Sequence, residues 1–123
     1  MSIKKNLNDV LKSLPNSVTL VAVSKTKPNS ALLEAYHSGQ KAFGENKVQE
    51  MAQKAKELPK DIIWHMIGHL QTNKVKFIAP FVSLIHGVDS IKLLNEINKR
   101  AEQNNRVIDC LLQVHIATES NKF

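Results

Sequence analysis

The residue best suited to chemistry in this sequence is Lys25, which closely follows a run of apolar and β-branched residues. Residues 18–28 read VTLVAVSKTKP, with aliphatic side chains on both parities of the apolar part. This pattern is typical of a strand buried on both faces of a parallel sheet. Pro28 lacks the N–H that a strand ladder needs, so the strand should end before it. Lys25 is therefore expected at the carboxyl end of a buried strand, the edge where α/β folds bind ligands.

An amine at such a strand end has the chemistry to attack a carbonyl group. Partial burial and the neighbouring cation Lys27 both favour the neutral amine, which is the nucleophilic form. The alternative is that Lys25 simply extends from the strand end into water, since lysine is rarely buried. The local pattern leaves both interpretations open.

Four further apolar runs also end in polar residues. These endings are Gly44-Glu45-Asn46, Gly68-His69, His86-Gly87-Val88-Asp89 and His115-Ile116-Ala117-Thr118-Glu119. Because the carboxyl ends of parallel strands lie at one edge of a sheet, we expect these groups to meet at one rim, as in a (β/α) barrel or a doubly wound fold.

The elements that would position these residues alternate along the chain. Strands are expected at 18–23, 42–44, 62–67, 82–88 and 107–117, and helices near 7–14, 30–38, 47–58, 70–79 and 91–101. Asn29 or Ser30 is expected to cap the second helix, and Asp89 or Ser90 the fifth. Alternating strands and helices predict a parallel sheet with right-handed crossovers.

The composition is that of an ordinary globular domain. The 123 residues are 42% hydrophobic and 23% charged, and Cys110 is the single cysteine, which excludes an internal disulfide framework and fits a reducing compartment. No apolar stretch approaches the roughly 20 residues of a membrane span, and the amino terminus lacks the apolar region of a signal peptide. We therefore expect a soluble, cytoplasmic protein.

The formal net charge of +6 predicts an anionic partner. The basic residues are scattered, however, and only two of them are arginine, whereas nucleic-acid-binding surfaces cluster basic residues and use arginine to recognise bases. A small phosphorylated ligand is therefore favoured over nucleic acid. No metal site is expected either, because Gly68 interrupts the helix that the spacing of His65 and His69 would require.

Five blocks of this sequence resemble the YggS/PROSC family of pyridoxal phosphate homeostasis proteins. The blocks read VAVSKTKP, FGENKVQE, WHMIGHLQTNK, IHGVDS followed by KLLNEIN, and LLQVHIATESNKF, and they lie in this order within 20–123. The family is similar in fold to the barrel domain of alanine racemase. The resemblance thus implies an α/β fold of the (β/α) TIM-barrel type that binds pyridoxal 5'-phosphate (PLP).

The resemblance also assigns roles to residues. It implies that Lys25 forms the Schiff base with PLP, and that Asn46 and His65 lie near the cofactor ring. Two structural alternatives remain, because Asn46 would also suit the cap of the following helix and His65 would also suit a packed position inside the barrel. Lys27 and Lys122 match family lysines that accept PLP transiently, although solvated surface lysines would look the same.

For function, the resemblance implies a PLP carrier without turnover of its own, with PLP-dependent apo-enzymes as candidate partners. The alternative is a PLP-dependent amino-acid racemase, which needs a second acid–base group opposite the lysine. In alanine racemases that group is a tyrosine from a separate domain, whereas Tyr36, the single tyrosine here, is predicted on an outer helix, and only His86 and His115 are candidates for a second base at the rim. The sequence therefore favours the carrier.

A complete (β/α) barrel has eight strands and typically about 250 residues, but only five strands are predicted here. We therefore expect residues 1–123 to form an incomplete barrel domain, the amino-terminal part of a longer protein. Its unpaired strand edge and its exposed barrel-interior face should both favour self-association. PLP should bind more weakly than to a complete member, because the loops after strands seven and eight often supply the phosphate site.

Overall fold

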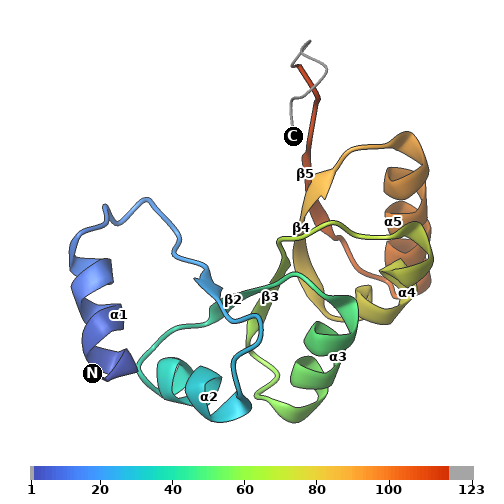
Figure 1. Ribbon diagram of the computed structural model, residues 1–123. Helices are drawn as coiled ribbons and strands as arrows, with labels where there is room; N and C mark the ends of the chain where they lie inside the picture. Colours follow the sequence, from blue (N-terminus) through green and yellow to red (C-terminus); the bar gives the residue numbers. More distant parts are fainter. Residues whose placement is uncertain (1, 117–123) are drawn as a thin grey trace.

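The computed structural model describes residues 2–116, which form one parallel sheet of five strands with helices between them. The strands are β1 (Ala22–Val23), β2 (Ala42–Glu45), β3 (Ile63–Met66), β4 (Val82–Val88) and β5 (Asp109–Leu112). They lie in the sheet in their sequence order, and each pair of neighbours is parallel (Figure 1). This arrangement is that of the first five strands of a (β/α) barrel and confirms the predicted fold class.

The helices pack mainly along one side of this sheet (Figure 1). They are α1 (Ile3–Lys12), α2 (Asn29–His37), α3 (Val48–Glu57), the short 3₁₀ helix η1 (Thr72–Lys74), α4 (Val75–Ile78) and α5 (Ile91–Gln103). No helix among residues 2–116 is both long and apolar enough to cross a membrane.

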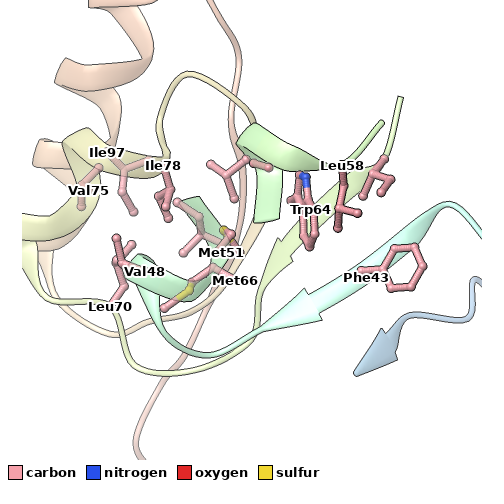
Figure 2. Packing of buried hydrophobic residues seen from close by; sticks show 14 of the residues in the cluster. Phe43, Val48, Met51, Leu58, Trp64, Met66, Leu70, Val75, Ile78 and Ile97 are labelled. Carbon is pink, nitrogen blue, oxygen red and sulfur yellow. The ribbon is translucent and has the colours of Figure 1, made fainter. Parts of the chain in front are cut away.

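The hydrophobic core lies between the sheet and these helices. Met51 of α3 packs in the same cluster as Trp64 and Met66 of β3, and all three are almost completely buried (Figure 2). The ring of Phe43 in β2 lies 6.1 Å from that of Trp64, centroid to centroid. Burying a large apolar side chain contributes roughly 1.5–3 kcal/mol, so these contacts stabilise the packing of α3 against β2 and β3.

The opposite face of the sheet is open within the described residues. Val23 of β1 is 57% exposed and Ile63 of β3 is 43% exposed. The prediction that the first strand is buried on both faces is therefore wrong. An apolar run on both parities also fits a strand whose second face is left uncovered, and β1 begins only at Ala22 rather than at residue 18.

The remaining helix and strand boundaries agree in part with those predicted from the sequence. β4 spans the predicted 82–88, and Ser90 caps α5 by accepting a hydrogen bond from Leu93 N at 3.1 Å. The predicted side-chain cap of α2 is wrong, because Pro28 holds the N-cap position and the Asn29 amide donates to Glu57 Oε1 instead. The predicted helix at 70–79 is reduced to η1 and α4. β5 spans only 109–112, and residue 117 and Lys122 lie outside the described residues.

Candidate functional site

Lys25 lies in a tight turn at the carboxyl end of β1, as predicted. The turn is closed by Lys27 N, which donates to Ser24 O at 3.1 Å, and Thr26 within it has a φ of 64°. The Lys25 residue is exposed, so the expected partial burial is not found. The structure therefore presents Lys25 at the carboxyl edge of the sheet, exposed to solvent.

The strand register brings Lys25 and Asn46 to neighbouring strand ends. Val23 pairs with Gly44, and Gly44 pairs in turn with His65. Lys25 and Asn46 each follow this row by two residues, at the carboxyl edge of the sheet. His65 lies in the row itself, two residues further from the carboxyl edge than Lys25 and Asn46. Of the three predicted site residues, two therefore share the edge and the third lies behind them.

Asn46 is half-buried and lines a pocket of about 450 Å³ together with Lys47, His69, Gln71 and Lys74, among others. The N-cap of α3 is Lys47, and no side chain caps that helix. The alternative role of Asn46 as a helix cap is therefore wrong. A side chain at Gly68 would clash here, since its Cβ would lie 2.7 Å from Asn46 Cβ. Gly68 thus lets the loop after β3 pass against Asn46.

His65 is buried and lies against a second histidine. Its Nδ1 is 3.2 Å from His86 Nε2, with the two rings edge to face. Burial lowers the pKa of His65, and the nearby His86 lowers it further. The pair therefore favours a neutral His65, whose ring nitrogens act as one donor and one acceptor.

Sequence reasoning named His86 only as a possible second base at the rim and not as a cofactor-binding residue. It was visible as a polar residue near the end of an apolar run, but its partner depends on the strand register. That register shifts between Trp64 and His65, where β4 contains one extra residue. His86 also borders a pocket of about 220 Å³ with Gly68 and Asp89.

A buried ionic cluster lies beneath the Lys25 turn. Lys54 Nζ contacts Glu45 Oε2 and Glu50 Oε2, each at 2.8 Å, and donates to Ser24 O at 2.7 Å. The Ser24 hydroxyl donates to Glu45 in a short hydrogen bond. This cluster was missed from the sequence, although Glu50 and Lys54 have the i, i+4 spacing of a helical ion pair.

The Lys54 ammonium favours the charged form of its half-buried partner Glu50. The hydrogen bond from Lys54 lowers the pKa of Glu50, burial opposes this effect, and the bond from Thr26 N lowers the pKa again. Glu50 is therefore held as a carboxylate at neutral pH and accepts from both groups.

Tyr36 is on the outer helix α2, as predicted. Its hydroxyl donates to Asp61 Oδ1 at 2.6 Å, and Lys41 Nζ lies 4.0 Å from its ring centroid. Lys41 precedes β2 and Asp61 precedes β3, so this group lies at the amino edge of the sheet, opposite to Lys25.

With this geometry described, comparison with known proteins identifies the family. The model described as "Alanine racemase, N-terminal domain" matches residues 1–119. The chain belongs to the alanine racemase N-terminal domain family.

Among curated proteins, the chain is similar to several pyridoxal phosphate homeostasis proteins. It is 45% identical to that of Aquifex aeolicus over 108 residues, covering 87% of this chain and 47% of the relative. It is 37% identical to that of Haemophilus influenzae, covering 99% of this chain and 57% of the relative. The chain thus spans about half the length of these relatives. The sequence resemblance to the YggS/PROSC family is confirmed.

Solved structures support the same family. PipY from Synechococcus elongatus PCC7942, solved without PLP, matches with a TM-score of 0.90 and 40% identity over 98% of this chain and 57% of that chain. PipY with PLP bound matches with a TM-score of 0.88, over 94% of this chain and 56% of that chain. The alanine racemase N-terminal domain fold therefore covers the whole described sheet.

Proposed function

We propose that this chain binds PLP at the carboxyl edge of its sheet, with Lys25 as the attachment residue, and serves PLP homeostasis. The observation that carries this proposal is the placement of Lys25, an exposed primary amine on the turn after β1 and next to the end of β2. Support also comes from the relatives, which are named pyridoxal phosphate homeostasis proteins, and from PipY, which was solved with PLP bound.

The three predicted site residues fit the chemical groups of the cofactor. PLP supplies an aldehyde that condenses with a primary amine, and an exposed lysine provides one. The Asn46 amide and the neutral imidazole of His65 offer hydrogen-bond donors and acceptors for a polar aromatic ring. Lys54 does not fit the attachment role, because its ammonium is buried and directs its hydrogen bonds to three oxygens.

We propose a carrier that has no catalytic turnover. A racemase needs a second acid–base group across from its lysine, and the Tyr36 hydroxyl is instead engaged with Asp61 at the opposite edge of the sheet. Formation of D-alanine from L-alanine with PLP present would contradict the carrier proposal. PLP-dependent apo-enzymes are the proposed recipients, and the free thiol of Cys110 is compatible with the proposed cytoplasmic location.

A spectrophotometric titration with PLP tests the proposed attachment. Wild type should show a saturable absorbance change, and Lys25→Ala should lose it or require at least about tenfold more PLP, since covalent attachment is removed. Lys27→Ala is the matched control, because Lys27 is an exposed lysine on the same turn. A titration curve for Lys25→Ala that overlays wild type would contradict the proposal.

A further inference from the structure

Two side chains of α3 hold the backbone on both sides of Lys25. Before it, Ser24 O accepts a hydrogen bond from Lys54 Nζ at 2.7 Å. After it, Thr26 N donates to Glu50 Oε2 at 2.6 Å. Lys54 Nζ and Glu50 Oε2 are themselves 2.8 Å apart. These contacts form a continuous bridge that spans Lys25, which we call the α3 bridge (Glu50 and Lys54).

The turn needs such support because of the backbone at Thr26. Its φ of 64° lies in the left-handed region, which β-branched residues rarely adopt. A residue in this conformation persists only when its surroundings hold it there. Glu50 supplies that restraint through the Thr26 N–H. If the bond is lost, the turn can relax, and the direction in which Lys25 leaves the backbone changes with it.

The bridge is anchored in the protein interior and not in solvent. The Lys54 side chain is 7% exposed, and Glu45, its second carboxylate partner, is fully buried. Glu45 also accepts a hydrogen bond from the Ser24 hydroxyl, so the buried carboxylate directly contacts the residue that precedes Lys25. A buried and paired ammonium with three acceptors has one geometry available to it. The bridge is therefore a rigid support for the turn.

We propose that Glu50 and Lys54 are positioning residues for Lys25, orienting its amine for reaction with an aldehyde. This inference rests on the proposed function. In the reaction, Lys25 Nζ as the neutral amine bonds to the aldehyde carbon, and its two hydrogens leave with the aldehyde oxygen as water. The bridge touches none of the reacting atoms and acts only through the backbone of Ser24 and Thr26.

Labelling by PLP with borohydride as the hydride donor tests this role. The ratio of label on Lys25 to label on the exposed Lys4 and Lys56 is measured by peptide mass spectrometry within each sample. Glu50→Ala should lower this ratio by about tenfold, and Glu50→Gln by about threefold, since a neutral amide oxygen still accepts from Thr26 N but more weakly than a carboxylate. The ratio is compared only among variants whose far-UV circular dichroism matches wild type, because unfolded molecules would also lose the preference for Lys25.

Glu57→Gln is the matched control. Glu57 is also a carboxylate of α3 with two side-chain partners, Asn29 and Gln53, but it does not contact the turn. Its ratio should equal that of wild type. Because Glu50→Gln keeps the shape of the side chain, comparing it with Glu57→Gln tests the positioning role even if Glu50→Ala does not fold.

The outcomes separate the two proposals. Preferential labelling of Lys25 in wild type, with equal ratios in Glu50→Gln and Glu57→Gln, would overturn the positioning role alone. No preference for Lys25 in wild type would overturn the proposed function, and this inference would fall with it. A lower ratio in Glu50→Gln than in Glu57→Gln supports both.

Discussion

Two lysines near the same turn differ in the environment of their amines. Lys54 Nζ is buried and makes contacts of 2.7–2.8 Å with three oxygens, so its ammonium is held as a structural charge. Lys25 is exposed at the strand end. A buried ammonium with saturated donors cannot act as a nucleophile without breaking its cluster, whereas an exposed amine is available to a ligand.

The same two lysines show what could be predicted at the residue scale. Lys25 was predictable because an apolar run followed by Pro28 marks a strand end. Lys54 was not, because two of its partners come from the turn after β1 and from β2, up to 30 residues away in sequence. Helical periodicity does place Lys54 on the buried side with Met51 and Ala55, but periodicity cannot reveal which carboxylates lie there.

The buried His65 predicts a pH dependence of stability. Burial, and then His86, lowers the pKa of His65 below its ordinary value of 6.5. Between the lowered pKa and 6.5 the unfolded state therefore binds more protons than the folded state, so stability is fully present above 6.5 and is lost as the pH falls. Between about pH 7.5 and about pH 5, the free energy of unfolding measured with urea should fall less for His65→Gln than for wild type.

His37→Gln is the control for this prediction, because His37 is exposed at the end of α2. Its pH dependence should equal that of wild type. If His65→Gln loses as much stability on acidification as wild type, the buried ring is not the source of the effect.

At the scale of elements, the close passage of the loop after β3 against the residue after β2 shapes the candidate site. Gly68→Ala should reduce the free energy of unfolding by about 1–3 kcal/mol, the range for overpacking. The added Cβ would lie 2.7 Å from Asn46 Cβ and 3.0 Å from its Cα and carbonyl oxygen. Chemical denaturation measures the loss.

A double variant gives the matched comparison. Asn46→Gly removes the nearest atom, so Gly68→Ala should cost less in an Asn46→Gly background than in wild type. Equal costs in the two backgrounds would show that the loss does not arise from this contact.

Element boundaries were predictable where packing follows local pattern. α3 is buried on one side by regular apolar spacing and β4 coincides with a largely apolar run, and both were found close to the predicted residues. β1 and β5 are shorter than predicted, because an apolar run indicates strand propensity but not how many of its residues find a ladder partner. The register shift at His65 likewise depends on the neighbouring strand, so the contact with His86 required the structure.

At the scale of the whole molecule, the sheet has one packed face and one open face. Val23 and Ile63 of the open face are exposed, as is Leu111 of β5. Exposed apolar side chains on a strand face favour association with another surface. Sedimentation velocity should therefore show a mass that increases with protein concentration, and the double variant Val23→Thr/Ile63→Thr should weaken this increase.

Ile91→Thr is the control for association. Ile91 is 72% exposed, more than either residue of the open face, but it begins α5 rather than lying in a strand. Its substitution should leave association unchanged. A concentration-independent monomer for the wild-type chain would contradict the prediction.

The fold class was predictable at this scale because strict alternation of strands and helices leaves few topologies. The open face was predicted from the number of strands alone. The exposure of β1 on that face was not predicted, because an apolar run has the same sequence pattern whether one face of the strand or both are covered. The family followed from five short blocks in order, and the family match over residues 1–119 agrees with it.

The most direct test of the account is to locate the lysine that reacts with PLP. The protein is incubated with limiting PLP, reduced with borohydride, digested and analysed by mass spectrometry, in parallel with Lys25→Ala and Lys27→Ala. The account predicts that the label is on Lys25 in wild type and Lys27→Ala, and is absent from the corresponding peptide of Lys25→Ala with no gain elsewhere. Undiminished total labelling of Lys25→Ala would contradict it.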